Sequence, residues 1–343
     1  MRNTLYIIGL SFAIISCGSS KPTQKVVAKP KPATTTPAKT TPAAVPIATG
    51  KPHVTNDGHN DFYKVNIADP SKNDNTISYG SIVTAKPASY KVVKTYFPAV
   101  AQNFRTRYLI LHYTALDNDK SVTVLTQQSV SAHYLVNDLD DKEIYQLVDE
   151  NKRSYHAGIS AWRKDNMLND TSIGIEIVNL GFTPDGAGGR TFYQYPEWQV
   201  KKIAALAKDI VDRYQIPATN VLGHSDIAPT RKQDPGPFFP WKRLYTEYGL
   251  GMWYDDATVQ SFQGSITPEE FAAQLNNSTF IFKVQTYLQQ FGYGLEPSGT
   301  WDNATKKTIE AFQYHFRPQN YSGVMDAETW AILQALVQKY PAK

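Results

Sequence analysis

The sequence has only one cysteine, Cys17, among its 343 residues. A single cysteine excludes an intramolecular disulfide and any zinc site made of several thiolates. The apolar run of residues 5–15 is too short for a membrane-spanning helix, which needs roughly 20 such residues. A fold held together by disulfides is therefore excluded, and this run is not a membrane span.

Acidic residues are absent from the first 56 positions. This stretch holds seven of the 35 basic residues and none of the 31 acidic ones, so the overall charge of +4 arises at one end of the chain. The rest of the chain has 28 basic and 31 acidic residues. The basic excess is not part of a folded surface, and we therefore expect no nucleic-acid partner.

The start of the chain has the layout of a secretory signal peptide. A basic residue precedes the apolar run, and Cys17 follows that run closely. Residues 14–17 resemble the lipobox of bacterial lipoproteins, in which the cysteine is lipid-modified and becomes the mature N-terminus. An ordinary cleaved signal with an incidental cysteine is the alternative. We expect a signal peptide over residues 1–16, lipidation of Cys17 and attachment to a membrane through the lipid.

Residues 21–50 contain neither aromatic nor acidic residues and consist largely of Pro, Thr, Ala and Lys. Such a segment cannot bury enough apolar surface to fold. Its prolines favour an extended chain with a reach of very roughly 90 Å at most. We therefore interpret residues 17–78 as a lipidated N-terminus followed by a disordered tether.

The patterns of strands and helices begin near residue 79. Strand-length runs rich in branched or aromatic residues occur at 108–111, 132–136, 144–148 and 173–178. Apolar residues recur at helical spacing over 196–214, and residues 220–223 form a further short candidate strand. Strands and helices thus share one predicted domain, residues 79–258.

From about residue 267 the pattern changes to helical segments separated by glycine turns. Apolar residues recur at helical spacing over 281–291, 308–312 and 330–340. Asp302 and Asp326 precede the second and third segments, where a carboxylate can accept hydrogen bonds from free helical amides. The sequence predicts a small all-α three-helix domain over residues 267–343.

Two of the seven histidines end predicted strands and lie near a candidate carboxylate ligand. His112 and His224 hold these strand-end positions, and Asp234 follows His224 by ten residues. Two imidazoles and a carboxylate can bind zinc and leave a fourth position for water. We expect His53, His59 and His315 to be solvated or packed. Spacing alone does not establish the metal site.

Six segments of the chain resemble a known enzyme family. LILHYTA, SAHYLV, YHAGISAWR, LNDTSIGIEIVN and VLGHSDIAPTRKQDPGPFFPW follow one another across residues 108–241. They resemble the type-2 zinc-dependent N-acetylmuramoyl-L-alanine amidases, most closely the AmiD-like lipoproteins of the bacterial outer membrane. FKVQTYLQQFGYGLEPSGTWDNATKKTIEAFQYHF resembles the peptidoglycan-binding three-helix module that follows the catalytic domain in such proteins. The resemblance implies an α/β fold with a central mixed β-sheet flanked by helices, as in peptidoglycan-recognition proteins.

The resemblance also implies roles for five residues. The family's ligands for one Zn²⁺ ion fall on His112, His224 and Asp234, its catalytic carboxylate on Glu176 and its basic residue on Lys232. The implied reaction is hydrolysis of the amide between N-acetylmuramic acid and L-alanine, with Glu176 as the base for a zinc-activated water. Lys232 would stabilise negative charge on the carbonyl oxygen. Without the resemblance, Glu176 could instead be a buried carboxylate paired with a lysine or arginine. Lys232 could instead be a solvated lysine in a loop.

Four residues are predicted to contact the substrate. Tyr113 and Thr114 follow a ligand, His156 lies in a glycine-containing loop, and Trp162 can stack on a sugar or a peptide. Packing is the alternative for Tyr113 and Trp162, and support of the site is the alternative for His156. We interpret His133 as a structural residue that donates a hydrogen bond.

Two other functions remain open. One is a non-catalytic peptidoglycan-binding protein of the same fold, and the other is a metal endopeptidase that cuts within the stem peptide. The complete set of ligands, together with Glu176 and Lys232, favours catalysis over binding alone, and the family resemblance favours the amidase. We therefore expect peptidoglycan or muropeptides as substrate, a monomeric protein, and a location at the outer membrane facing the periplasm.

Overall fold

The computed structural model describes residues 87–92, 101, 103–186 and 189–342. The predicted signal peptide, Cys17, His53, His59 and the whole of the predicted tether lie outside these described residues. The chain divides into two units, residues 1–53 and 54–343, and every described residue belongs to the second. Among the described residues, no helix is both long enough and apolar enough to cross a membrane.

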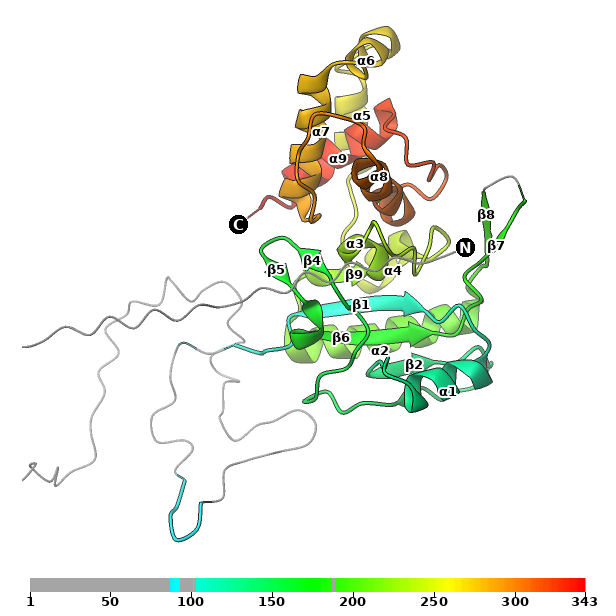
Figure 1. The fold of residues 1–343 in the computed structure, drawn as a ribbon, viewed down its shortest axis with the longest axis vertical. Helices are drawn as coiled ribbons and strands as arrows, with labels where there is room; N and C mark the ends of the chain where they lie inside the picture. Colours follow the sequence, from blue (N-terminus) through cyan, green and yellow to red (C-terminus); the bar gives the residue numbers. More distant parts are fainter. Residues whose placement is uncertain (1–86, 93–100, 102, 187–188, 343) are drawn as a thin grey trace, which may run out of the picture. The chain divides into compact units, whose positions relative to one another are not determined.

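A five-stranded sheet in the order β3-β2-β6-β1-β9 forms the centre of the amidase-like part (Figure 1). Its strands are β1 Tyr108–Tyr113, β2 Tyr134–Val136, β3 Tyr145–Gln146, β6 Ser172–Ile177 and β9 Val221–Gly223. β6 and β9 run parallel to β1, β2 runs parallel to β6, and β3 is antiparallel to β2. The predicted mixed sheet is confirmed.

The two central strands are buried along nearly their whole length. β1 and β6 are rich in Leu and Ile, and Leu109, Ile110, Leu111, Ile173 and Ile175 have no exposed surface. Such continuous apolar strands are typical of a parallel sheet that is covered on both faces. The predicted helix over 196–214 is confirmed as α2, Glu197–Tyr214, whose buried residues pack into the same core.

Shorter elements surround the sheet. The helices are α1 Asn118–Gln127, α3 His224–Ile227 and α4 Trp241–Tyr248, with single 3₁₀ turns at Leu168–Asp170 and Ala218–Asn220. Two small hairpins are formed by β4 Ala161–Trp162 with β5 Asp165–Asn166 and by β7 Phe182–Pro184 with β8 Arg190–Phe192. Figure 1 shows α3 and α4 between the sheet and the C-terminal helices.

The C-terminal helices number five among the described residues, where the sequence pattern predicts three. They are α5 Asp256–Gln263, α6 Pro268–Gln274, α7 Ser278–Phe291, α8 Asn303–Phe316 and α9 Ala327–Lys339. The last three correspond to the predicted helices. The predicted caps are confirmed, because Asp302 accepts a hydrogen bond from the Thr305 amide and Asp326 accepts one from the Thr329 amide. We call α5–α9 the helical layer.

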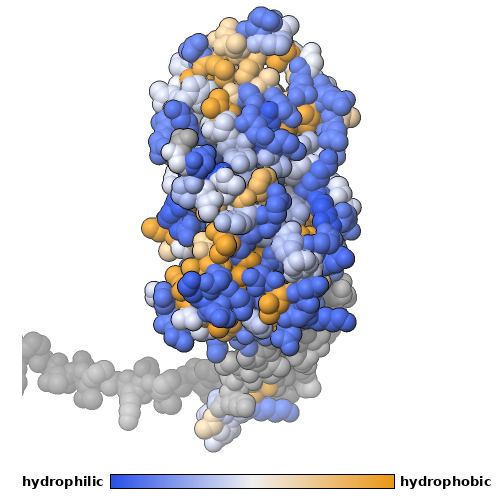
Figure 2. Space-filling model, turned by 90° about the vertical axis from the view of Figure 1, so that its right-hand side faces the viewer, coloured by the Kyte–Doolittle hydropathy of each residue, from blue (hydrophilic) through white to orange (hydrophobic). Residues whose placement is uncertain are grey.

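One hydrophobic core continues from the sheet into the helical layer. Trp162 of β4 packs edge-on against Phe291 of α7 and against Tyr293, at ring-centroid distances of 5.8 and 5.1 Å. The two predicted domains therefore form one compact unit. The face of this unit seen in Figure 2 is largely hydrophilic, with small groups of apolar residues between the polar ones.

Candidate metal centre

Three predicted ligands meet at one edge of the sheet. His112 lies near the end of β1, and His224 begins α3 directly after β9. Because β1 and β9 are parallel neighbours, their carboxyl ends lie at the same edge. Asp234 follows in the loop before α4, and the Ser225 amide donates to its backbone carbonyl at 2.8 Å. All three side chains are buried.

The three candidate ligand atoms form a nearly equilateral triangle. The Nδ1 atoms of His112 and His224 are 2.9 Å apart, and each lies 3.0 Å from Oδ2 of Asp234. Three donor atoms at these separations are close enough to bind one Zn²⁺ ion together at the usual ligand distances of about 2.0 Å. Among the described residues, this is the only such cluster of His, Cys, Asp or Glu side chains.

Hydrogen bonds on the far side of each imidazole determine which nitrogen faces the centre as an acceptor. Nε2 of His224 lies 3.1 Å from the Ala157 carbonyl, so it carries the proton and leaves Nδ1 as a lone pair. Nε2 of His112 lies 2.9 Å from Nδ1 of His156, whose own Nε2 lies 3.1 Å from the Ser172 hydroxyl. In a consistent assignment of protons, Nε2–H of His112 donates to Nδ1 of His156, and Nε2–H of His156 donates to the Ser172 hydroxyl.

The centre therefore consists of three acceptors with no proton between them. Burial and the neighbouring His224 lower the pKa of His112 to about 4, so that its imidazole is neutral. Burial alone would raise the pKa of Asp234, but the two imidazoles hold it below its ordinary value. Two lone pairs and a carboxylate oxygen about 3 Å apart repel one another unless a cation lies between them, and zinc suits this donor set.

Glu176 is positioned beside the centre by the sheet register, because it pairs with His112 across β1 and β6. Burial, reinforced by Asp234, raises the pKa of Glu176 to about 8, and Lys232 opposes this shift. Its buried Oε2 has no hydrogen-bond partner among the described residues. An unpaired carboxyl group of raised pKa at the edge of a pocket is typical of a functional acid or base.

A pocket of about 360 Å³ opens over these side chains. Glu176, Lys232, His224 and Asp234 line it, together with Tyr113 and Thr114. Further lining residues come from α1, from the loops around Ser131 and Tyr155, and from β7. The structure thus brings together the five residues predicted for metal binding and catalysis and three of the four predicted for substrate contact, Tyr113, Thr114 and His156. Their roles remain predictions.

The prediction that Trp162 contacts the substrate is wrong. Its side chain has no exposed surface, and its indole NH donates to the Thr219 carbonyl at 2.9 Å. His156 does border the pocket, but both of its ring nitrogens are already engaged, with His112 and Ser172. The alternative role of supporting the site therefore fits His156 better than a hydrogen bond to substrate.

His133 and His315 are both buried. Nδ1 of His133 accepts a hydrogen bond from the Gly174 amide, so its Nε2–H donates to the Lys152 carbonyl at 3.0 Å, which agrees with the predicted structural role. His315 is packed, one of the two predicted alternatives, and its Nδ1 lies 2.8 Å from Asp226.

Two supporting residues were missed by the sequence reasoning. Asn169 accepts hydrogen bonds from the amides of His156 and Ala157, at 3.1 and 2.7 Å. Arg231 donates to the carbonyls of Ala157 and Ile159, both at 2.9 Å. No local pattern marks either residue, because the partners of Asn169 lie 12 and 13 residues away and those of Arg231 lie 72 and 74 residues away.

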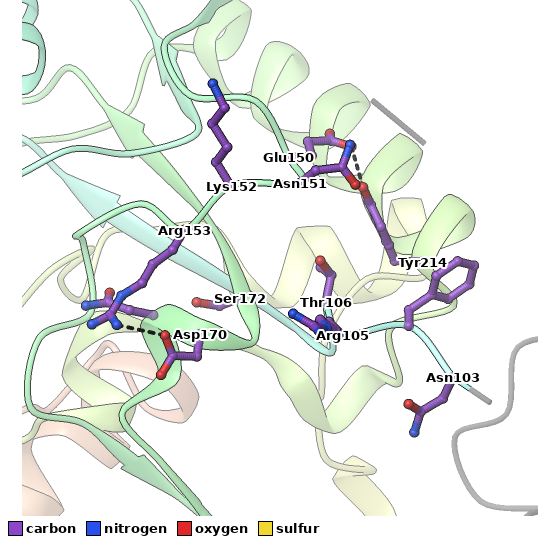
Figure 3. A pocket seen from close by; sticks show the side chains of 12 residues that line it. Asn103, Arg105, Thr106, Glu150, Asn151, Lys152, Arg153, Asp170, Ser172 and Tyr214 are labelled. Carbon is purple, nitrogen blue, oxygen red and sulfur yellow. Dashed lines mark hydrogen bonds and ion pairs between the residues drawn. The ribbon is translucent and has the colours of Figure 1, made fainter. Parts of the chain in front are cut away.

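A second pocket of about 500 Å³ lies at the amino ends of β1 and β6 (Figure 3). In Figure 3 Arg153 points toward Asp170, with which it forms an ion pair of 2.9 Å. Ser172, which lines this pocket, accepts the hydrogen bond from His156. Among the described residues, the one cluster of three potential metal ligands is that of His112, His224 and Asp234, and none of these three lines this second pocket.

Comparisons with known proteins agree with this geometry. Residues 102–237 match the family model described as N-acetylmuramoyl-L-alanine amidase, and residues 277–333 match the one described as putative peptidoglycan binding domain. The N-acetylmuramoyl-L-alanine amidase AmiD of Escherichia coli (strain K12) is 43% identical over 244 residues, which are 69% of this chain and 84% of that protein. The 1,6-anhydro-N-acetylmuramyl-L-alanine amidase AmpD of Enterobacter cloacae is 41% identical over 105 residues, 31% of this chain and 51% of that protein.

Two solved structures are similar over most of the chain. A complex of Escherichia coli AmiD with the substrate anhydro-N-acetylmuramic acid-L-Ala-D-γ-Glu-L-Lys has a TM-score of 0.67 and 40% identity, covering 75% of this chain and 98% of that one. AmpDh3 of Pseudomonas aeruginosa has a TM-score of 0.62 and 41% identity, covering 76% of this chain and 100% of that one.

The fold, with three converging ligand side chains at the carboxyl edge of its sheet, defines a class of hydrolytic enzymes. The chain belongs to the N-acetylmuramoyl-L-alanine amidase family. The predicted family, fold class and amidase activity are thereby confirmed.

Proposed function

We propose that this protein is a zinc-dependent amidase that separates the stem peptide of peptidoglycan from N-acetylmuramic acid. The observation that carries the proposal is the triangle of three acceptor atoms on His112, His224 and Asp234. Beside it lies Glu176, whose buried Oε2 has no hydrogen-bond partner among the described residues. Zinc bound there would polarise the scissile carbonyl and lower the pKa of a water molecule.

The chain's own residues supply the remaining chemistry. Glu176 accepts the proton of the attacking water and delivers it to the leaving amide nitrogen of L-alanine, acting first as general base and then as general acid. Lys232 lines the same pocket and places a cation where the carbonyl oxygen becomes negative. The products are a lactyl carboxylate on the sugar and a peptide that begins with L-alanine.

Peptidoglycan or its muropeptides is the proposed substrate. Support comes from the relative whose solved structure holds anhydro-N-acetylmuramic acid-L-Ala-D-γ-Glu-L-Lys and from the AmpDh3 complex with anhydromuramic pentapeptide. Tyr113 and Thr114 are the proposed substrate contacts, since both line the pocket beside a ligand. The helical layer is proposed to hold the cell wall, because residues 277–333 match a putative peptidoglycan binding domain.

We further propose that the protein is a monomer anchored through lipidated Cys17 to the outer membrane, facing the periplasm. The position of the sole cysteine directly after a signal-like segment supports the anchor. Metabolic labelling with a fatty-acid analogue tests it. Wild-type protein should incorporate the label and fractionate with outer membranes, whereas Cys17→Ser should do neither; a labelled C17S protein would contradict the anchor.

Digestion of purified muropeptides tests the enzyme. Release of peptides that begin with L-alanine should require Zn²⁺, stop with a chelator and return on addition of the metal. Glu176→Ala should reduce turnover by at least ~10³-fold and leave zinc bound, because the residue is not a ligand. Cleavage within the stem peptide would indicate the endopeptidase instead, and zinc-loaded protein that binds without cutting would indicate the non-catalytic alternative.

A further inference from the structure

Asp226 lies fully buried where the end of β9, the short helix α3 and the helical layer meet. Its Oδ2 accepts hydrogen bonds from the Gly223 amide and from Nδ1 of His315, both at 2.8 Å. Its Oδ1 accepts one from the Tyr293 hydroxyl at 2.9 Å. Asp226, His315 and Tyr293 are each 1% exposed. Two of the three donors to this carboxylate therefore come from the helical layer or its loops.

The amide that Asp226 holds belongs to the turn that carries a candidate metal ligand. Gly223 ends β9 and immediately precedes His224, the first residue of α3. Two residues after Gly223, the Ser225 amide donates to the backbone carbonyl of Asp234, which is another candidate ligand. The conformation of this one turn thus sets the positions of two of the three ligand side chains.

Without the helical layer, Asp226 would keep only one of its three donors. Removing partners from a buried carboxylate costs far more than losing an exposed hydrogen bond, because the charge stays desolvated and uncompensated. The side chain would then turn toward water and release the Gly223 amide. The placement of His224 consequently depends on groups that lie about 70 to 90 residues later in the chain.

The orientation of the His315 donor is fixed by stacking on both faces of its ring. Trp241 of α4 and Phe316 of α8 each lie 3.9 Å away between centroids, inclined by 14° and 8°. The ring's other nitrogen, Nε2, is buried and has no hydrogen-bond partner among the described residues. This histidine therefore presents one donor, in one direction, to Asp226.

We propose that His315 and Tyr293 are positioning residues of the metal centre. Acting through Asp226 and the Gly223 amide, they hold the turn that carries His224, so that the helical layer is a working part of the metal site as well as the proposed wall-binding module. The inference rests on the proposed function in one respect, namely that a metal binds to His112, His224 and Asp234.

Two substitutions of His315 in the full chain separate positioning from packing. His315→Phe keeps a ring between Trp241 and Phe316 but removes the donor. His315→Asn removes the ring but keeps an amide NH near the place of Nδ1. We expect H315F to weaken Zn²⁺ binding about tenfold and H315N to keep it within about threefold of wild type. The thermal midpoint should show the opposite order, with H315N the less stable variant.

Tyr293→Phe gives an independent variant, because it removes only the hydroxyl that donates to Asp226. Tyr340→Phe is its matched control, since this helical-layer tyrosine bonds to the backbone of Trp253 instead. The readouts are the Zn²⁺ dissociation constant by chelator competition and the visible spectrum of the Co²⁺-substituted protein. We expect Y293F to weaken Zn²⁺ binding and shift the Co²⁺ spectrum, and Y340F to change neither.

Wild-type Zn²⁺ affinity and an unchanged Co²⁺ spectrum in both H315F and Y293F would overturn the inference. The inference would also be overturned if the loss of Zn²⁺ affinity simply paralleled the loss of thermal stability across H315F, H315N, Y293F and Y340F, because the effect would then be one of packing. If the wild-type protein itself binds no Zn²⁺, the proposed function fails instead. Amide hydrogen exchange of Gly223 in the metal-free proteins then still decides the inference: it should be faster in H315F and Y293F than in Y340F, and equal rates would refute it.

Discussion

Ionising Glu176 costs the folded protein free energy. Burial and the neighbouring Asp234 raise the pKa of its carboxyl group to about 8, well above the ordinary value of 4.5. The same carboxyl group must be ionised to act as a base. A cation at the three ligands would favour that ionised form. The raised pKa thus lowers the stability of the metal-free protein wherever this carboxyl group is ionised, and the proposed role of Glu176 as a base needs that ionised form.

Glu176→Gln should stabilise the metal-free protein in a pH-dependent way. The pKa of Glu176 is higher in the folded protein than in the unfolded chain, so between pH 4.5 and about 8 the folded state binds more protons. The free energy of unfolding that this residue contributes is therefore full below pH 4.5 and is lost as the pH rises toward 8. The amide does not titrate, so E176Q should show no such loss and should unfold at a higher temperature than wild type at pH 8. Thermal unfolding between pH 4.5 and 8 measures this difference.

The control for this experiment is Glu143→Gln, which removes a charge from an exposed side chain. Turnover should be lost in E176Q and retained in E143Q. A difference in unfolding temperature between E176Q and wild type that is the same at every pH would contradict the burial argument.

The position of a single side chain could be predicted from the local sequence where it depends only on the strand that carries the residue. His112 and His224 adjoin the carboxyl ends of parallel neighbours, so that their proximity could be predicted from the pattern together with the family resemblance. Trp162 could not be placed in this way. What buries its indole is Phe291 and Tyr293, well over a hundred residues away, and nothing in the local pattern records that contact.

The elements around the centre support the ligands from behind as well as from the sides. His156, in the loop before β4, contacts Nε2 of His112, on the side of that ring away from the candidate metal centre. Strand β6 passes directly beneath the ring of His156. A β-carbon at Gly174 of β6 would lie only 2.4 Å from Cγ of His156. Glycine at this position of the strand therefore provides the space for the hydrogen bond that orients His112.

Gly174→Ala should displace His156 and weaken the metal site. The added methyl group cannot fit without moving the ring or the strand, and loss of a hydrogen bond behind a metal-ligating histidine typically lowers metal affinity 10–100-fold. Zn²⁺ titration measures the effect. Gly264→Ala, at the end of α5, is the matched control, because the nearest atom to its added carbon is 3.5 Å away. Equal Zn²⁺ affinity in both variants would contradict the proposed crowding.

Long elements with a clear period were predicted well, and short ones were not. α2 runs for 18 residues and buries one consistent face, so that its spacing alone located it within one residue. α5 has eight residues, of which only Val259 is buried. The sequence pattern did not predict this helix, which begins inside the predicted domain 79–258 and ends before the predicted domain 267–343. In the structure it packs against α9 and belongs to the helical layer.

At the scale of the whole described unit, the amidase part and the helical layer share one core and one buried hydrogen-bond cluster. Arg190 of β8 adds a further link, donating to Glu310 and Tyr314 of α8 at 2.8 and 3.0 Å. A deletion of the helical layer therefore removes much more than the proposed wall-binding surface. Loss of sacculus binding in a truncated protein would not by itself distinguish binding from folding.

Removal of residues 256–343 should consequently destabilise the amidase part itself. Trp162, which has no exposed surface in the intact chain, would lose the rings that cover it, and Asp226 would lose two donors. Burial of a large aromatic side chain contributes about 3 kcal/mol, a substantial fraction of the ~5–15 kcal/mol that stabilises a typical domain. We expect the truncated protein to unfold at a markedly lower temperature and to bind Zn²⁺ more weakly, by calorimetry and chelator competition. A truncated protein with the stability and Zn²⁺ affinity of the intact chain would show that the shared core is dispensable, and sacculus binding could then be assigned to the helical layer from the deletion alone.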